Sequence, residues 1–381
     1  MIKIKLSPAE VNYPIIVRAG LLEESGNWAA RSIGKGAKRV AIVSNHTIWE
    51  LYGDNLSSSL KSAGLEFKEI LLPDGEKYKS LQTLQKILLQ LSENKLSRED
   101  LIIGFGGGVI GDITGFAASI YLRGCNFLQI PTTLLAMIDA SVGGKTGVNT
   151  DFGKNLVGTF YNPRAVLIDP LLLQTLDKRQ IIAAYCEAAK HALLAGGRLF
   201  DETKAFLRSF PADSLQGIPR SVKTQQRVSK LIQQQINFKA SIIREDPFEQ
   251  AGRSDPRSRK ILNFGHTFGH ALEQVTNYRK LLHGEAVGYG MLFESILAKK
   301  LELLEDPELE LLYDVVRSCG TLPPLGTINI AEIKKAISFD KKKLSGSVQW
   351  VLLKKIGRPV VISQSQIPQK VLDSALEEFL K

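Results

Sequence analysis

Cysteine is scarce in this 381-residue chain, and long apolar runs are nearly absent. The three cysteines, Cys125, Cys186 and Cys319, are far apart and form no CxxC pair. This spacing excludes a disulfide scaffold and a thiolate zinc site, and it predicts a reducing, cytoplasmic location. The first residues also lack the apolar core of a signal peptide. The apolar window 101–122 contains six glycines, so we expect a buried strand and a loop there rather than a membrane span.

The composition is that of a globular protein. Apolar residues make up 44% of the chain and charged residues 23%, which excludes extended disorder and collagen-like fibre. The net charge of +10 favours acidic partners, either phosphates or nucleic acid. No aromatic residues interleave with the basic clusters, so we expect no nucleic-acid binding. The length predicts two domains.

The first 170 residues alternate between two hydrophobic patterns. Short apolar runs predict strands, and stretches with helical spacing separate them; this alternation indicates an α/β domain with a largely parallel sheet. The expected strands are 39–44, 65–72, 101–104, 127–130 and 166–168, and the expected helices are 48–63 and 81–91. After Pro170 the pattern predicts an all-α-helical domain, with helices at 181–194, 222–243, 266–275, 286–304 and 309–319. We therefore expect domains 1–170 and 171–381, with an exposed loop at 247–257.

A glycine-rich loop, 104–112, follows one expected strand and precedes a helix. Glycines let backbone N–H groups approach a phosphate closely, and a helix N-terminus favours an anion. This arrangement suits a dinucleotide pyrophosphate, although the spacing departs from GxGxxG and a tight structural turn is the alternative. The polar loop 74–79 follows another strand, so it is expected at the same sheet edge.

A second glycine-rich segment contains lysines. Lys145 and Lys154 are flanked by glycines and amides within 139–155, and Arg123 lies just upstream. Positive side chains on a closely approaching backbone suit a phosphate or carboxylate. A surface loop without a ligand is the alternative.

Histidine is concentrated in one short region. Only five occur in the chain, and His266, His270 and His283 lie within 18 residues. His266 and His270 share a helix face, and His283 is expected at a helix start. Imidazoles with a carboxylate predict a zinc or similar divalent site, although a hydrogen-bonded structural set is the alternative. Spacing does not choose among Glu187, Glu273 and Glu285 as the carboxylate, nor does it tell a ligand from a proton relay. His46 and His191 are isolated and are expected to be structural.

Together, these motifs resemble the 3-dehydroquinate synthases, within the sugar phosphate cyclases. The resemblance covers nearly the whole chain. The matching segments are PDGEKYKS (73–80), GGGVIGD (106–112), PTTLLA (131–136), DASVGGKT (139–146), GKN (153–155), Glu187 with Lys190, LNFGHTFGH (262–270) and LHGEAV (282–287).

The resemblance implies a Rossmann-like N-terminal domain, a helical C-terminal domain and a homodimer. It also implies NAD and a divalent metal, zinc or cobalt, as cofactors. The substrate would be 3-deoxy-D-arabino-heptulosonate 7-phosphate, in the shikimate pathway of aromatic amino-acid biosynthesis. NAD would oxidise a metal-held hydroxyl, phosphate would be eliminated, the hydride would return, and an aldol closure would give 3-dehydroquinate.

Motif matching also implies roles for individual residues. The metal ligands would be Glu187, His266 and His283, with His270 handling protons. The substrate residues would be Asp139, Lys145, Asn155, Lys190, Lys239, Arg259 and Asn263, with Arg123 reaching the phosphate from the partner subunit and Lys341 or Lys342 as a phosphate lysine. NAD would lie against Asn45, Asp74, Gly75, Glu76, Lys77, Tyr78, Lys79, Gly108, Val109, Ile110, Gly111, Asp112, Thr132, Thr133, Lys145, Lys154, Leu172, Leu173, Gln174 and Thr175.

Two features depart from the family pattern. The stretch between Lys239 and Asn263 is longer than expected, which leaves Arg257 as an alternative to Arg259. Asn45 stands where an acid is also common, and it would meet the adenosine ribose.

The competing functions are another sugar phosphate cyclase, of the inosose or valiolone type, and a metal-dependent polyol dehydrogenase. The intact segment 143–146 favours dehydroquinate synthase over its sister cyclases.

Overall fold

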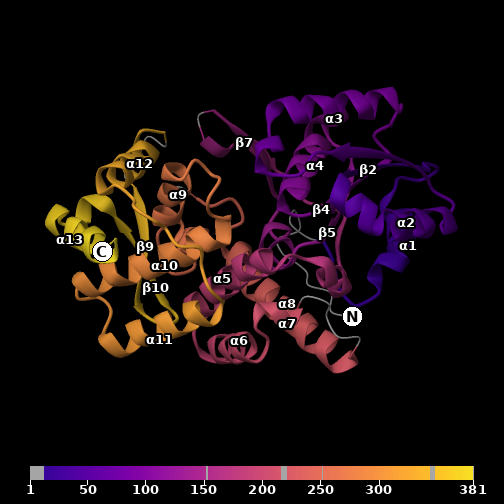
Figure 1. Ribbon diagram of the computed structural model, residues 1–381. Coiled ribbons are helices and arrows are strands. Elements are labelled where there is room, and N and C mark those ends of the chain that lie inside the picture. The colour runs from indigo at the N-terminus through magenta and orange to yellow at the C-terminus, as the bar shows by residue number, and fades with distance from the viewer. Residues whose placement is uncertain (1–12, 152, 216–220, 251, 344–347, 381) are drawn as a thin grey trace. The chain divides into compact units, whose positions relative to one another are not determined.

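The computed structural model describes residues 13–151, 153–215, 221–250, 252–343 and 348–380, without the side chains of 339–343. The chain forms two compact units (Figure 1). The first contains the described residues of Met1–Leu176 and Gly217–Ala240, and the second those of Asp177–Gln216 and Ser241–Lys381. Within the described part of the chain, no helix is long and apolar enough to cross a membrane.

A parallel sheet of six strands forms the centre of the first unit. Its order is β1-β8-β5-β4-β2-β3, and every neighbouring pair is parallel. The strands are β1 (Ile15–Val17), β2 (Arg39–Asn45), β3 (Glu66–Leu72), β4 (Leu101–Gly106), β5 (Asn126–Pro131) and β8 (Ala165–Ile168). The central strands are buried along their whole length, which explains their continuous apolar runs.

Helices cover both faces of this sheet (Figure 1). They are α1 (Ser25–Ser32), α2 (His46–Ser62), α3 (Leu81–Glu93) and α4 (Gly108–Ile120). Leu84, Ile87 and Leu91 of α3 and Ile113 of α4 pack in one core with strand residues such as Ile102. Because each helix precedes or follows a parallel strand, the predicted α/β class is confirmed.

The glycine-lysine segment forms a hairpin, which its polar composition did not predict. Strands β6 (Lys145–Thr150) and β7 (Gly153–Phe160) pair antiparallel. Gly115 of α4 lies against Thr146, where an added Cβ would come within 2.5 Å of the threonine methyl. The close approach holds the hairpin against the helix that follows the glycine-rich loop.

The second unit is mainly helical. Its helices are α5 (Lys178–Ala195), α6 (Gly197–Ser209), α7 (Ala212–Leu215), α9 (His266–Val275), α10 (His283–Lys300), α11 (Asp306–Ser318), α12 (Ile330–Lys343) and α13 (Gln369–Phe379). Helix α8 (Val222–Glu245) contributes residues to both units. The expectation of an all-α-helical second half is too strict, because β9 (Gln349–Lys355) and β10 (Arg358–Ser363) form an antiparallel hairpin. The buried run 350–353 is as short as a strand and packs within this unit.

Close backbone contacts bring three helices of this unit together. A Cβ on Gly284 of α10 would lie 1.9 Å from the carbonyl oxygen of Ala183 on α5. A Cβ on Gly290 would lie 1.8 Å from the carbonyl oxygen of Gly265, which precedes α9. Only glycine permits these approaches. They bring together the parts of α5, α9 and α10 that carry Glu187, His266 and His283.

Candidate active site

Glu187 of α5, His266 of α9 and His283 of α10 converge inside the second unit. Their possible ligand atoms all lie within 4.8 Å of one another. The Oε1 atom of Glu187 is 3.8 Å from Nε2 of His266 and 3.6 Å from Nε2 of His283. Donor atoms around a tetrahedral zinc ion with bonds of about 2.0 Å are roughly 3.3 Å apart, so the three side chains need little movement to bind a cation.

The imidazole of His266 is oriented by the backbone. Its Nδ1 is 3.1 Å from the carbonyl oxygen of Phe264, so Nδ1–H donates and Nε2 is left with its lone pair toward Glu187. Burial lowers the pKa of His266 well below its usual value, and the positive charge of Lys190 lowers it further. Both effects favour the neutral imidazole, which is the form that binds a metal.

The three carboxylates left open by the sequence have different positions. Glu285 lies at the start of α10, where it accepts from Leu282 N at 2.7 Å and pairs with Arg179 Nε at 2.6 Å. Glu273 is buried behind His283, with its Oε2 3.5 Å from Nδ1 of that histidine. Its position suits a group that orients the histidine through the nitrogen facing away from Glu187.

His270 lies at the open side of the cluster. It is exposed, and its ring centroid is 5.5 Å from that of His266 and 5.8 Å from that of His283. His270, Glu273 and His283 form a second group with ligand atoms within 4.8 Å. His283 belongs to both groups, and a third group contains Asp139, Glu187 and His191, so geometry alone leaves three overlapping sets of donors among the described residues.

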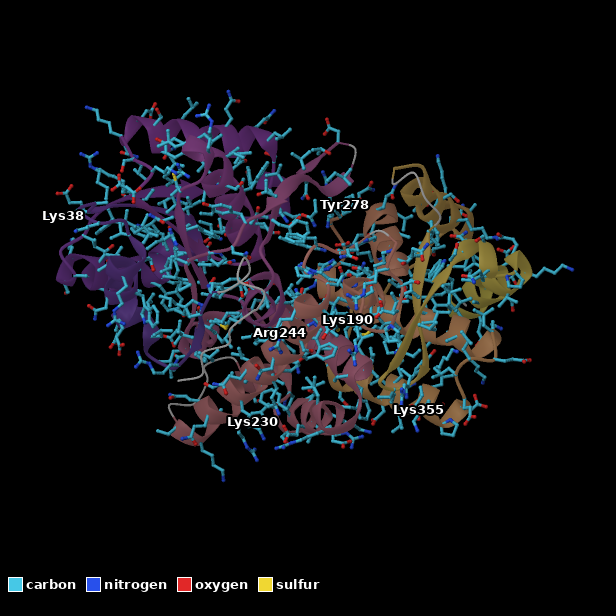
Figure 2. All side chains as sticks on the ribbon, turned by 180° about the vertical axis from the view of Figure 1, so that it is seen from behind. Lys38, Lys190, Lys230, Arg244, Tyr278 and Lys355 are labelled. Carbon is cyan, nitrogen blue, oxygen red and sulfur yellow. The ribbon has the colours of Figure 1, made fainter. Side chains whose placement is uncertain are left out.

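Lys190 is buried beside the cluster, whereas Lys38 and Lys355 lie at the surface (Figure 2). It is one turn along α5 from Glu187, and its Nζ is 2.6 Å from Oε2 of that residue. A buried ammonium group is costly unless it is paired. Here the glutamate supplies the pairing, and the lysine remains next to the two histidines.

In the first unit, the expected cofactor residues follow the carboxyl ends of the parallel strands. Asn45 ends β2, Asp74 follows β3, Gly108 follows β4 and Thr132 follows β5. The amide of Asn45 donates to Asp74, and its Oδ1 accepts from Ile48 N at 2.9 Å, which caps α2. The turn 172–175 follows β8, and Thr175 contacts the hydroxyl of Tyr52 at 2.8 Å. Parallel strands place all of these groups at one sheet edge.

The 74–79 loop and the β6–β7 hairpin meet through polar side chains. Lys79 Nζ contacts Asp112 Oδ2 at 2.5 Å and Asn155 Oδ1 at 2.6 Å. Asn149 Nδ2 donates to Glu76 Oε1 at 2.8 Å. Burial lowers the pKa of Lys79, but the carboxylates of Asp112 and Glu76 outweigh it, so this pKa is raised. Lys79 therefore stays charged and joins the glycine-loop helix to the hairpin that carries Lys145, Lys154 and Asn155.

Asp139 and Lys239 form a further pair within the first unit. Lys239 Nζ lies 2.7 Å from Oδ1 of Asp139 and 2.8 Å from its carbonyl oxygen. The lysine is largely buried near the end of α8, and the aspartate is partly exposed. The structure thus brings together two residues that lie a hundred positions apart.

The long loop after α8 folds back onto Arg259. Asp246 is fully buried and accepts from Gln250 N and Arg259 N, both at 2.9 Å. The guanidinium of Arg259 donates to Pro247 O at 2.7 Å, whereas Arg257 is exposed. Asn263 is exposed and is 3.4 Å from Glu249. Of the two candidate arginines, Arg259 is the one held in place.

Arg123 is not brought to the carboxyl edge of the sheet. It lies beyond the C-terminal end of α4, one helix of 13 residues or about 20 Å away from Gly108. With Arg98 and Arg164 it borders a cavity of about 570 Å³ at the amino ends of β4 and β5. Lys341 and Lys342 are in the last turn of α12, and their side chains lie outside the described part of the chain.

The comparisons with known proteins decide the family. Residues 69–183 match the 3-dehydroquinate synthase N-terminal family, and residues 184–343 match the 3-dehydroquinate synthase C-terminal family. The chain belongs to the 3-dehydroquinate synthase family. The resemblance expected from the sequence motifs is confirmed, and so is the prediction of an enzyme of this family.

Curated and solved relatives agree with this assignment. The 3-dehydroquinate synthase of Methylacidiphilum infernorum is 39% identical over 377 residues, 99% of this chain and 98% of the relative. The 2-epi-5-epi-valiolone synthase of Streptomyces hygroscopicus subsp. jinggangensis, solved with NAD+ and Zn2+ bound, is 28% identical with a TM-score of 0.84 over 98% of each chain. A 2-deoxy-scyllo-inosose synthase, 24% identical with a TM-score of 0.85 over 99% of each chain, shares the fold.

Sequence reasoning about this 3-dehydroquinate synthase family member missed two buried acids. Asp246 follows the last residue of α8 and precedes the loop 247–257, and nothing in the pattern marked it as buried. Glu294 lies in the otherwise apolar run 290–298 of α10, and an acid in such a run is a usable signal of a buried polar contact.

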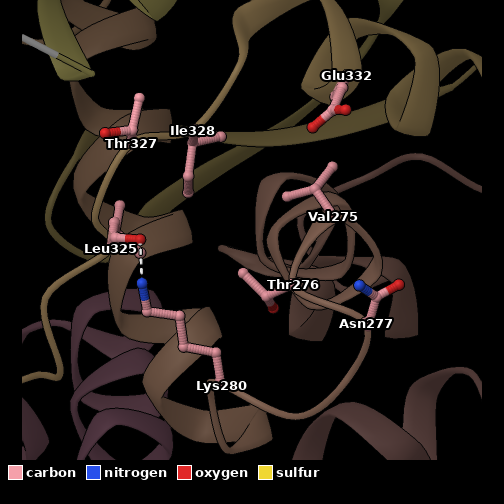
Figure 3. A pocket seen from close by; sticks show the side chains of 8 residues that line it. All are labelled: Val275, Thr276, Asn277, Lys280, Leu325, Thr327, Ile328 and Glu332. Atoms are coloured by element: carbon pink, nitrogen blue, oxygen red, sulfur yellow. Dashed lines mark hydrogen bonds between the residues drawn. The ribbon is translucent and has the colours of Figure 1, made fainter.

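A cavity of about 220 Å³ lies at the C-terminal end of α9 (Figure 3). Lys280 donates to Leu325 O across it, and Val275, Thr276 and Glu332 are among its lining residues. It is at the opposite end of α9 from His266. None of the expected site residues lines it.

Proposed function

We propose that this chain is a 3-dehydroquinate synthase that converts 3-deoxy-D-arabino-heptulosonate 7-phosphate to 3-dehydroquinate and phosphate. The observation that carries the proposal is the convergence of Glu187, His266 and His283 in a chain 39% identical to a curated 3-dehydroquinate synthase along 99% of its length. The fold and the sequence motifs agree with it.

Glu187, His266 and His283 would hold a divalent cation, zinc or cobalt. Two neutral imidazole nitrogens and one carboxylate oxygen are donors that suit zinc and leave a coordination position for substrate. Glu273 would orient His283 through Nδ1, as Phe264 O orients His266. The donor set therefore fits the cation in its chemistry and in its spacing.

NAD would bind at the carboxyl edge of the sheet. Gly108–Gly111 at the N-terminus of α4 would face the pyrophosphate, because the first N–H groups of a helix and the helix dipole favour an anion there. Asn45 and Asp74, joined by a hydrogen bond, would meet the adenosine ribose. The remaining expected contacts are in 75–79, Asp112, Thr132, Thr133, Lys145, Lys154 and 172–175.

Charged and amide side chains matched by the family motifs would hold the substrate. We assign Lys145, Lys190, Lys239, Arg259 and Asn263 to its phosphate, carboxylate and hydroxyl groups, together with Asp139 and Asn155. One of Lys341 and Lys342 would add a phosphate contact. Cationic donors are suited to a substrate that carries both a carboxylate and a phosphate.

A cation held by Glu187, His266 and His283 would supply Lewis-acid polarisation of a substrate hydroxyl, and NAD bound at the sheet edge would supply reversible hydride acceptance. The chain's own groups supply the remaining steps. His270, exposed beside the cluster, would move the proton of that hydroxyl. Lysines and arginines would stabilise the leaving phosphate dianion, and the side chains that hold the substrate would orient the ring for its aldol closure.

We also propose a homodimer in which Arg123 reaches the phosphate in the partner subunit. Leu122 and Arg123 have φ of 47° and 64°, a strained backbone in the turn that follows α4, at the end of that helix away from the glycine loop. Three apolar side chains in this region are exposed: Ile120 at the end of α4, Leu122 in the turn and Phe160 at the end of β7. A hydrogen bond of 2.8 Å between Thr159 and Ser119 joins β7 to α4. Exposed apolar groups around a strained turn are typical of an interface.

Residues 1–170 would form the NAD domain and 171–381 the metal and substrate domain. The location we propose is the cytoplasm, where the three buried free cysteines would stay reduced.

The test follows phosphate and 3-dehydroquinate after mixing purified protein, NAD, Zn2+ or Co2+ and 3-deoxy-D-arabino-heptulosonate 7-phosphate. We expect equimolar release of both products, no net NADH, and loss of turnover with a chelator. Accumulation of NADH would instead indicate a polyol dehydrogenase. Turnover of glucose 6-phosphate or another sugar phosphate, with none of the heptulosonate, would indicate a sister cyclase.

A further inference from the structure

Glu294 is a fully buried acid that the proposed reaction does not use. It lies on α10 with 0% of its surface exposed. Its Oε2 accepts from the backbone N–H of Gly265 at 2.6 Å. Burial raises the pKa of Glu294 well above its usual value, and the backbone N–H groups of Gly265, Phe268 and Thr267 oppose the rise.

These contacts place the carboxylate at the N-terminus of α9, whose first residue is His266. The preceding residue, Gly265, is left-handed with φ of 80° and has no side chain to cap the helix. The first N–H groups of a helix need acceptors from outside the helix. Glu294 supplies that acceptor from a neighbouring helix, held there by the close contact of Gly290 with Gly265.

One peptide group connects Glu294 to the imidazole of His266. The N–H of Gly265 and the C=O of Phe264 belong to the same planar peptide, on opposite sides of it. The N–H donates to Glu294 and the C=O accepts from Nδ1 of His266. Fixing this plane at one side therefore fixes the acceptor at the other, and with it the direction of Nε2.

We propose that Glu294 is a positioning residue for His266: it locks the Phe264–Gly265 peptide so that the imidazole presents Nε2 toward Glu187 and His283. This inference rests on the proposed function, in which those three residues bind the metal. Loss of the carboxylate frees the peptide to turn. The histidine then spends part of its time aimed away from the cation, and metal affinity falls.

The experiment compares Glu294→Gln, Glu294→Asp and Glu294→Met in the full-length protein. Gln keeps a side-chain oxygen that can accept from the N–H of Gly265. Asp places its oxygens one methylene farther away, and Met fills a similar volume but offers no oxygen acceptor. The control is Leu91→Ala, which removes buried volume on α3, in the core of the first unit. The readouts are the Co2+ dissociation constant by chelator competition, the visible spectrum of the Co2+ protein, and the melting temperature of the metal-free protein.

We expect the Met and Asp variants to bind Co2+ about 10- to 100-fold more weakly, with an altered spectrum. Gln should restore both properties to near wild type, and Leu91→Ala should melt at a lower temperature with unchanged Co2+ binding. Wild-type affinity and spectrum in the Asp and Met variants would overturn the positioning role and leave the proposed function intact. If Met fails to fold, Asp decides. A wild-type protein that binds no Co2+ would overturn both.

Discussion

At the scale of single side chains, we propose different roles for two histidines on α9: His270 as a proton carrier and His266 as a metal ligand. Changing His270→Asn should leave the bound metal in place and lower kcat by about 10²- to 10⁴-fold, because a proton carrier is lost while the donors Glu187, His266 and His283 remain. Metal content by elemental analysis and turnover by phosphate release would be measured on the same preparation. Loss of the metal together with turnover would instead make His270 a ligand.

The matched control is His266→Asn. It removes Nε2 from the set of three donors, so metal content should fall along with activity. Equal metal content in the two variants would favour the other donor group, made of His270, Glu273 and His283.

Asp246 offers a second test, in the pH dependence of stability. Burial raises the pKa of Asp246, but the N–H groups of Gln250 and Arg259 outweigh it, so its pKa is lowered in the folded chain. Its contribution is then complete above the unfolded value of about 3.9 and is lost as the pH falls through the lower folded value. Asp246→Asn should cost about 1–2 kcal/mol at pH 7, and the difference from wild type should shrink below about pH 4.

Urea unfolding at a series of pH values would measure this difference. Asp201→Asn, an exposed change on α6, should leave the unfolding free energy unchanged throughout. A difference between Asp246→Asn and wild type that stays constant from pH 7 to pH 3 would show that the charge of Asp246 plays no part.

The composition and spacing predicted the histidine cluster but left three carboxylates open, and only the family motifs pointed to Glu187. The density of histidines and the spacing of His266 and His270 were sufficient to place a site on α9 and at the start of α10. Glu187 lies far upstream on α5, and only helix packing brings it within 4 Å of both imidazoles. Glu285, much nearer in sequence, pairs with Arg179 instead. Sequence separation therefore carries little information about which acid completes a site.

Between helices, the contact of Gly290 with Gly265 holds the site together. Gly290→Ala would put a Cβ 1.8 Å from a backbone oxygen, so α9 and α10 must separate. We expect a loss of at least about 2 kcal/mol in unfolding free energy and weaker metal binding, because His266 and His283 move apart. Denaturant unfolding and chelator competition would measure the two effects.

Gly252→Ala is the control, since no atom lies within 4 Å of its added Cβ. It should change the unfolding free energy by no more than about 0.5 kcal/mol. Unchanged stability and metal binding in Gly290→Ala would mean that the two helices can shift without disturbing the donors.

The elements predicted best were those whose composition matches their burial in the fold. Runs such as 39–44 and 101–104 are mostly apolar because both faces of a parallel strand are buried. The helical spacing of apolar residues between these runs then indicated an α/β domain. The β6–β7 hairpin was missed because its residues are glycine, lysine, threonine and asparagine, which turns and loops also use. It forms because Asn149 and Asn155 bond to the 74–79 loop, a contact between segments distant in sequence.

For the complete enzyme, the proposed dimer predicts that two inactive variants restore each other. Arg123→Ala should lose activity because the partner's substrate loses a phosphate contact, and Glu187→Gln because its own metal site is broken. In a mixed dimer, one site has both an intact Glu187 and an intact partner arginine. Random mixing after reversible dissociation makes half of the dimers mixed, so about one quarter of wild-type activity should return.

Turnover of a co-refolded mixture, compared with each variant refolded alone, measures this recovery. If Arg123 served its own subunit, every site in the mixture would lack one of the two groups, and the mixture would stay as inactive as its components. A mixture of Glu187→Gln with His266→Asn gives the baseline. Each change damages the metal site of the subunit that carries it, so neither metal site of a mixed dimer is intact. Recovery with Arg123→Ala but not with His266→Asn is therefore expected only if the arginine acts across the interface of the proposed dimer, and its place beyond the C-terminal end of α4, away from its own glycine loop, motivates the test.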